Sequence, residues 1–237
     1  MNERRHPQTG QPVGAPVDTK PAARPGPGPV KLVGRHGRVE RLSLWHAASL
    51  WPQIKDAEPI WTYIPDSGPF PDEAAFHDWL ARPVAAEDPY AYAIVDRDGR
   101  AVGTAALMNI NPTMRVIEVG SIVYGPALQR TPLGTEAQYL LARYAFETLG
   151  YRRYEWKCDA LNAPSRGAAL RYGFTFEGVF RQHMIRNGRN RDTAWFSIVD
   201  GEWPARKAAF ERWLKPDNFD TTGRQIERLN RSADPRV

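Results

Sequence analysis

A short run of polar and small residues near the middle of the chain has the composition of a phosphate-binding turn. The run, Gln129-Arg130-Thr131-Pro132-Leu133-Gly134-Thr135, follows an apolar stretch at 116–123 and precedes an apolar-periodic stretch at 137–149. A strand that turns tightly into a helix directs free backbone N–H groups toward one point, at the positive end of the helix dipole. We expect this turn to hold phosphate, although an ordinary strand-to-helix turn has the same composition.

The spacing of the run limits the kind of phosphate site it could form. A Walker loop needs a lysine before Ser or Thr, and a dinucleotide fingerprint needs three spaced glycines; the run has neither. Pro132 brings no N–H, so a diphosphate bound here would lack one backbone donor, while the fixed φ of proline could preshape the turn.

Two further segments flank this run. The upstream segment is Ile117-Glu118-Val119-Gly120-Ser121-Ile122-Val123-Tyr124-Gly125-Pro126, and downstream a strand at 153–158 leads to Asn162, Ser165, Gly173-Phe174 and Glu177-Gly178. In order and spacing, the three segments resemble the GCN5-related N-acetyltransferase (GNAT) superfamily, and within it the RimJ/RimL-like group that acetylates ribosomal-protein N-termini. The resemblance extends over 39–201 and is strongest at 117–178. Pro132 departs from the family pattern, which usually has a glycine there.

This resemblance implies a fold and a reaction. The fold is α/β of the α+β kind, with a mixed central sheet of about seven strands flanked by helices and splayed at the acyl-CoA site. The reaction moves an acetyl group from acetyl-CoA, as cosubstrate, to a primary amine by direct attack, with no covalent enzyme intermediate and no metal.

The resemblance also implies which residues bind the cosubstrate. The backbone around two residues of the upstream strand would hold the thioester and the pantetheine arm, and Asn162 would contact the same arm. The turn would hold the diphosphate. The residues concerned are Ile122, Val123, Gln129, Arg130, Thr131, Leu133, Gly134 and Thr135.

Two residues match family positions that take part in the chemistry. Glu118 is the candidate base that removes a proton from the ammonium, and the alternative is a surface or cap-paired glutamate. Ser165 is the candidate hydrogen-bond donor to the departing thiolate, and the alternative is a helix N-cap. Many relatives have a tyrosine acid where this chain has Ala169, so that acid is missing here.

The acceptor wall lies outside the shared motifs. By position, Trp61, Tyr63, His183 and Arg186 are candidates to line it. Each could equally be structural, because aromatic clusters usually pack in cores and isolated histidines are usually not catalysts.

Composition excludes several classes of protein. Cys158 is the only cysteine, so no intrachain disulfide can form, and the five histidines show no metal-ligand spacing. No run of about 18 apolar residues is present, and the first thirty residues lack the apolar centre of a secretory signal. The net charge is +5, but the basic residues are scattered and no nucleic-acid-binding motif occurs. We expect a cytoplasmic protein without metal, membrane or nucleic-acid partners.

The elements needed to position these residues follow from local patterns. Residues 1–29 are rich in Pro and Gly and are expected to be a disordered tail, 30–200 the acetyltransferase domain, and 201–237 a C-terminal helical extension that could cover the core or serve a homodimer. Helices are expected at 47–54, from Asp72 as cap to 82, from 137, at 165–172 and at 203–214. Strands are expected at 90–95, 100–108, 116–123, 153–158, 176–185 and 193–199, with two short ones between 30 and 44.

Three functions remain open. The acceptor could be a small molecule or a peptide, it could be the N-terminus of a ribosomal protein, or the chain could be a non-catalytic acyl-CoA-binding or interaction module. The last alternative follows from Pro132 and the missing tyrosine acid.

Overall fold

A single eight-stranded sheet forms the centre of the molecule. The computed structural model describes residues 3–26, 30–64 and 67–230 of the chain. The strands, in spatial order, are β3 (Lys31–Val33), β4 (Gly37–Arg41), β5 (Tyr90–Asp96), β6 (Ala101–Asn111), β7 (Val116–Tyr124), β8 (Arg153–Asp159), β10 (Arg189–Val199) and β9 (Thr175–Arg186). Neighbours are antiparallel except for β7 and β8, which are parallel. The sheet is mixed, as predicted, and its eight strands include the two short ones expected between 30 and 44, which are β3 and β4.

Side chains of the central strands are buried on both faces of the sheet. In β5, Tyr90, Tyr92 and Ile94 belong to one hydrophobic cluster. The alternate residues Ala91, Ala93 and Val95 belong to the other. This alternation is the two-residue period of a strand, and it requires helices on both faces.

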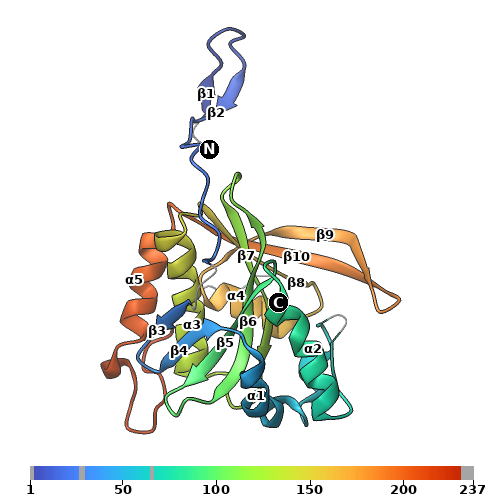
Figure 1. The fold of residues 1–237 in the computed structure, drawn as a ribbon. Helices are drawn as coiled ribbons and strands as arrows, with labels where there is room; N and C mark the ends of the chain where they lie inside the picture. The colour runs from blue at the N-terminus through green and yellow to red at the C-terminus, as the bar shows by residue number, and fades with distance from the viewer. Residues whose placement is uncertain (1–2, 27–29, 65–66, 231–237) are drawn as a thin grey trace.

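The helices divide between these two clusters. Helices α3 (Pro132–Arg143), α4 (Ala163–Arg171) and α5 (Trp203–Trp213) pack on the face that carries Tyr92, while α1 (Ala47–Ile54) and α2 (Glu73–Ala85) cover the other face. Figure 1 shows α3 beside α5, and α1 and α2 on the opposite side of the sheet. A strand between the two layers can therefore present successive residues to different helices.

Helices α3 and α2 differ most from their predicted limits, each at an end that contains a proline, while α4 begins at Ala163 rather than at 165. Helix α3 begins at Pro132 rather than at 137, because the missing N–H and fixed φ of proline suit the first helical position. It continues into a π-helical turn, η3 (Tyr144–Thr148). Helix α2 begins after Asp72, which caps it as predicted, but it continues past Pro83 to Ala85. Pro83 lies in the last turn, where it removes only one hydrogen bond.

The N-terminal segment has structure of its own. Strands β1 (Glu3–Arg5) and β2 (Pro12–Gly14) form a hairpin that extends away from the body of the molecule (Figure 1). Further along, the backbone N–H groups of Ala22 and Ala23 donate to Pro112 and Leu149 in the domain. Residues 1–2 and 27–29 of the expected tail and 231–237 of the expected extension lie outside the described residues. Flexibility in solution and the domain limits stay predictions.

The C-terminal segment turns back onto the domain after α5. It includes a short 3₁₀-helix, η4 (Pro216–Asn218). The described part of the segment ends at Asn230, whose side chain donates to the carbonyl oxygen of Arg171. The remaining 3₁₀ turns are η1 (Leu44–His46) and η2 (Glu58–Trp61). Across the described residues, no helix has the length and apolar character needed to cross a membrane.

Candidate active site

A large cleft opens where β7 and β8 part. The two strands pair through only three residue pairs, from Val116 with Arg153 to Glu118 with Glu155. Beyond Glu118 they separate, and a cleft of about 1720 Å³ extends between β7, the start of α3, the start of α4 and the β9–β10 pair. Parallel strands that separate within a sheet leave backbone groups without partners, so a ligand can insert there.

A bulge gives β7 an irregular backbone at the same place. The pairing with β6 passes from Gly120 opposite Ala106 directly to Val123 opposite Thr104. Ser121, between them, has a φ of 47°, in the left-handed region. The predicted residues Ile122 and Val123 line the cleft within this bulge. Bulges commonly redirect backbone groups beside functional sites, and here the bulge lies on the edge that β8 leaves unpaired.

The predicted phosphate-binding turn lies at the start of α3. The backbone N–H of Gly134 donates to Oγ1 of Thr131, and the distance between the two atoms is 3.1 Å. The N–H groups of Arg130, Thr131 and Leu133 have no acceptor within the described part of the chain. All the predicted turn residues except Leu133 line the cleft. The turn therefore offers free donors at a helix N-terminus even though Pro132 supplies none.

Side chains of the turn support its shape. Gln129 donates from Nε2 to the carbonyl oxygen of Tyr124 at 2.8 Å, so this side chain holds the turn against β7. A Cβ added to Gly134 would lie 2.9 Å from the carbonyl oxygen of Leu128. Glycine is needed here because the helix and the preceding backbone approach closely. The side chain of Leu133 is buried in the core.

Glu118 is buried and hydrogen-bonded through one carboxylate oxygen. Its side chain is 7 % exposed. Oε2 accepts from Asn109 Nδ2 at 2.6 Å and lies 2.9 Å from Lys157 Nζ. Burial raises the pKa of Glu118, and Lys157 and Asn109 oppose that rise. The alternative of a surface or cap-paired glutamate is therefore wrong.

The second oxygen of Glu118 is left for another partner. No group of the described residues hydrogen-bonds Oε1. A Cβ added to Gly120 would lie 3.3 Å from Oε1, so the glycine keeps the space beside this oxygen open. Both residues line the cleft. A carboxylate with one anchored oxygen and one free oxygen is suited to accept a proton from a ligand.

Lys157 and Asn109 are site residues that the sequence analysis missed. Lys157 Nζ also lies 2.9 Å from Glu155 Oε2 and 3.9 Å from the centre of the Trp195 ring. Glu155 in turn pairs with Arg153 at 2.7 Å. The alternating charges Arg153-Glu155-Lys157 on an otherwise apolar strand were a signal for this cluster, because a period of two places them on one face.

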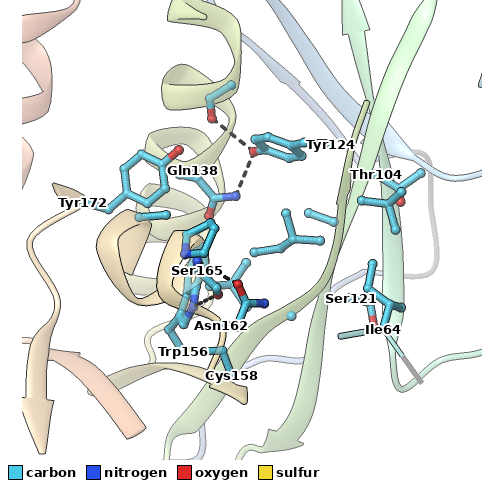
Figure 2. A pocket seen from close by; sticks show the side chains of 18 of the residues that line it. Ile64, Thr104, Ser121, Tyr124, Gln138, Trp156, Cys158, Asn162, Ser165 and Tyr172 are labelled. Carbon is cyan, nitrogen blue, oxygen red and sulfur yellow. Dashed lines mark hydrogen bonds between the residues drawn. The ribbon is translucent and has the colours of Figure 1, made fainter. Parts of the chain in front are cut away.

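Asn162 and Ser165, the two predicted residues at the start of α4, each have a defined local contact. Asn162 is the N-cap, since its Oδ1 accepts from the backbone N–H of Ser165 at 3.1 Å. Ser165 accepts from Trp156 Nε1 at 3.0 Å, so its hydroxyl keeps a proton to donate, and in the chain itself the hydroxyl also hydrogen-bonds the Cys158 thiol. The alternative of Ser165 as N-cap is therefore wrong. Both residues line the cleft, and Figure 2 shows them close together beside Trp156. Cys158, nearby, is buried, which raises the pKa of its thiol.

Tyr124 and Gln138 add a polar group that the sequence analysis did not identify. Tyr124 donates from its hydroxyl to the carbonyl oxygen of Gly134 at 3.1 Å and accepts from Gln138 Nε2 at 2.8 Å (Figure 2). Gln138 Oε1 is buried and has no partner within the described part of the chain. A buried acceptor without a partner is costly, so its place in the cleft fits a ligand that brings an N–H or O–H donor.

The predicted acceptor residues do not all reach the cleft. Tyr63, His183 and Arg186 line it, while Trp61 does not. Trp61 is 4 % exposed and packs edge-on against Phe70 and Trp79 in the core beneath α2. The Tyr63 hydroxyl donates to the carbonyl oxygen of Leu161 at 3.2 Å, which links the two sides of the cleft.

The nearby histidine also has a partner. His183 Nδ1 lies 2.9 Å from Thr193 Oγ1 on the neighbouring strand. Among the described residues, no group of three or more His, Cys, Asp or Glu side chains is arranged to hold a metal ion. The polar groups of the cleft include the buried carboxylate of Glu118, the carboxylate of Asp159, hydroxyls, amides, free N–H groups and several cationic side chains.

A family model and solved structures both match this chain, and both are acetyltransferases of the GNAT family. The model of the acetyltransferase (GNAT) domain matches residues 38–175. A solved structure, a GCN5-related N-acetyltransferase from Brucella melitensis, is 46% identical with a TM-score of 0.85, covering 89% of this chain and 96% of that one. A probable acetyltransferase of the GNAT family from Chromobacterium violaceum ATCC 12472 is 39% identical with a TM-score of 0.75, covering 81% and 97%. The family and fold predicted from the motifs are confirmed.

A curated relative matches over a shorter stretch. "Putative ribosomal N-acetyltransferase YdaF" of Bacillus subtilis (strain 168) is 30% identical over 110 residues. This match covers 46% of the present chain and 60% of that protein, so the chain spans less than two thirds of the length of the relative.

Proposed function

This chain belongs to the GNAT acetyltransferase family, and on that premise we propose that it transfers an acetyl group from acetyl-CoA to a primary amine. The observation that carries the proposal is the separation of β7 and β8, which opens one cleft to both faces of the sheet. Glu118 approaches this cleft from the face of α2, and Ser165 approaches it from the face of α4. A thioester inserted between the strands would meet both residues.

The cleft also suits the rest of acetyl-CoA. The diphosphate would be held by the free N–H groups of Arg130, Thr131 and Leu133 at the start of α3. The amide and hydroxyl groups of pantetheine would pair with the unpaired backbone of β7, with Asn162, and with the buried acceptor Gln138 Oε1. These are donors and acceptors of the kind that the ligand needs.

In the proposed mechanism, Glu118 prepares the amine for attack. An amine is mostly protonated at neutral pH, so it must lose a proton before its nitrogen can attack the thioester carbon. Oε1 of Glu118 accepts this proton, directly or through water, while Asn109 and Lys157 hold Oε2. The raised pKa of Glu118 makes it a better proton acceptor than an exposed glutamate.

Two other groups support the transfer itself. The backbone N–H groups near Ile122 and Val123, in the bulge of β7, would donate to the thioester oxygen as it gains negative charge. The Ser165 hydroxyl would donate to the sulfur as the carbon–sulfur bond breaks. The products are an acetylated amine and free coenzyme A.

The proposal is tested by release of free thiol from acetyl-CoA in the presence of a panel of amines. The wild type should release thiol with at least one amine, and Glu118→Gln should reduce the rate by roughly a hundredfold or more while acetyl-CoA still binds. Glu73→Gln, which changes an exposed glutamate on α2, is the matched control and should behave as the wild type. Tight binding of acetyl-CoA without thiol release from any acceptor would instead favour a non-catalytic acyl-CoA-binding module.

The name of the Bacillus subtilis relative favours a ribosomal-protein N-terminus as a second candidate acceptor. A panel that contains free amino acids, peptides with a free N-terminus and N-terminally blocked peptides with one lysine separates the alternatives. Thiol release only with peptides that have a free N-terminus would support the ribosomal candidate. Release with blocked lysine peptides or small amines would contradict it. We also propose that the protein works in the cytoplasm, where acetyl-CoA would be its cosubstrate.

A further inference from the structure

The segment after α5 forms one wall of the cleft. The side of this segment that faces the cleft is made by Phe219, Gly223, Arg224, Gln225, Ile226 and Arg228. Hydrogen bonds fix the segment in place: Trp213 Nε1 donates to Gln225 Oε1 at 2.8 Å, and Asn218 Nδ2 donates to the carbonyl oxygens of Trp213 and Glu227. We call residues 219–228 the C-terminal wall.

The C-terminal wall lies beside the first turn of α3. The Phe219 ring packs against the His36 ring, and the backbone N–H of His36 donates to Glu136 Oε2 of α3 at 2.7 Å. On the other side, Arg171 donates to Thr135 of α3 at 3.0 Å, and its guanidinium lies 4.9 Å from the centre of the Trp213 ring. The wall is therefore next to the helix end that offers free N–H groups for a diphosphate.

Positively charged side chains of the wall lie near the start of α3. Arg171, Arg224 and Arg228 all line the cleft, and no carboxylate of the described residues lies within 4 Å of their guanidinium groups. Asp220, in the same wall, uses its Oδ1 on the backbone N–H groups of Thr222 and Arg224. Burial of the guanidinium lowers the pKa of Arg171, and Tyr172 opposes that fall. Arg171 is a partly buried cation, and Arg224 and Arg228 are exposed cations on the cleft side of the wall, where together they suit an anionic ligand.

We propose that Arg224 and Arg228, with Arg171 behind them, bind the 3′-phosphate of coenzyme A, an inference that rests on the proposed function. Coenzyme A carries two anionic groups, the diphosphate and the 3′-phosphate on the adjoining ribose. One ribose links the diphosphate to the 3′-phosphate. If the start of α3 holds the diphosphate, the 3′-phosphate must therefore lie close to that helix end, in the region that the C-terminal wall borders. Ile226, whose side chain is 65 % exposed on the same wall, offers an apolar surface to the adenine.

The test compares acetyl-CoA with 3′-dephospho-acetyl-CoA by calorimetric titration into the full-length protein. The wild type should bind acetyl-CoA roughly tenfold or more tightly than the dephospho form, the effect of losing a charge-assisted hydrogen bond. Arg224→Gln combined with Arg228→Gln should remove most of this difference by weakening acetyl-CoA alone. Both side chains are exposed, so the double variant should fold. Arg212→Gln, exposed on α5 outside the cleft, is the control for surface charge and should keep the full difference.

The outcomes separate this inference from the proposed function. Equal binding of the two ligands by the wild type would overturn the 3′-phosphate site and leave the proposed function in place. Equal weakening of both ligands in the double variant would also overturn the site, because it would show that the arginines act on another part of the molecule. Failure of the wild type to bind either ligand would contradict the proposed function itself.

Discussion

Glu118 shows how neighbouring residues can set the properties of one carboxylate. The local sequence predicts a glutamate on a strand, but only the folded sheet brings Asn109 of β6 and Lys157 of β8 to the same oxygen. Asn109 reaches it from an irregular stretch of β6 and has a φ of 48°. Such contacts depend on the register of three strands, so they could not be read from spacing within one segment.

At this scale, Lys157→Met should change the pH dependence of turnover. Burial raises the pKa of Glu118, and Lys157 lowers it, so removing the lysine raises the pKa further. A base must be ionised to act, so the acid limb of the profile of kcat/KM against pH should move to higher pH. Lys215→Met, at an exposed lysine beyond α5, should leave the limb in place. If the acid limb of the Lys157→Met profile is unchanged, the ionisation of Glu118 does not determine that limb.

Ser165→Ala tests the proposed donor to the leaving sulfur. Kcat should fall about tenfold, because a hydrogen bond to a charged group is lost as the thiolate departs. The affinity for acetyl-CoA should stay within about twofold of the wild type, because the interaction strengthens only in the transition state. Steady-state kinetics together with calorimetric titration separate these quantities. A fall in affinity with kcat unchanged would assign Ser165 to binding alone.

At the scale of elements, sequence patterns located most strands and helices but not their irregularities. Apolar runs predicted β5, β7 and β8 to within one residue at each end, because strands buried on both faces are nearly continuous apolar segments, whereas β6 extends to Asn111 beyond the predicted end at 108. The bulge in β7 and the early separation from β8 carry no such signal, since they arise from how three strands meet. The start of α3 was misplaced because apolar periodicity begins at 137, whereas the cap at Thr131 and Pro132 define the first turn.

The junction of β7 and α3 gives a prediction about stability. Gly134→Ala should lower the free energy of unfolding by about 1–3 kcal/mol, because the added Cβ would lie 2.9 Å from the Leu128 carbonyl oxygen. Gly167→Ala in α4 is the matched control: nothing lies within 4 Å of its added Cβ. Alanine there should stabilise by about 0.5–1 kcal/mol through helix propensity. Urea denaturation measures both; equal effects of the two substitutions would contradict the close approach at Gly134.

At the scale of the whole molecule, the cleft divides the sheet into two parts. Strands β3 to β7 form one part, strands β8, β10 and β9 form the other, and only three residue pairs join them through β7 and β8. Packing of α3 and α4 on one face and the Tyr63 contact with Leu161 supply further connections. Sequence resemblance predicted a splayed sheet, but the C-terminal wall could not be predicted, because no motif of the segment indicates where it folds back.

This division predicts where ligand binding should stabilise the protein. Acetyl-CoA at about 100 times its dissociation constant should raise the free energy of unfolding by about 2.7 kcal/mol if it binds only the folded state. Hydrogen exchange should slow chiefly at 119–124 of β7, at the first turn of α3 and in the C-terminal wall, because these segments line the cleft. Exchange in β3 and β4, none of whose residues lines the cleft, serves as the internal control.

The same experiment tests whether the wall acts as part of the binding site. In the combined Arg224→Gln and Arg228→Gln variant, saturating acetyl-CoA should still slow exchange in β7 and α3 but should protect the C-terminal wall less. The expected difference arises because the thioester and diphosphate contacts remain while the proposed contact to the 3′-phosphate is lost. Protection that is uniform over the sheet, or absent from the wall in the wild type, would contradict a ligand held between the two parts and against the C-terminal wall.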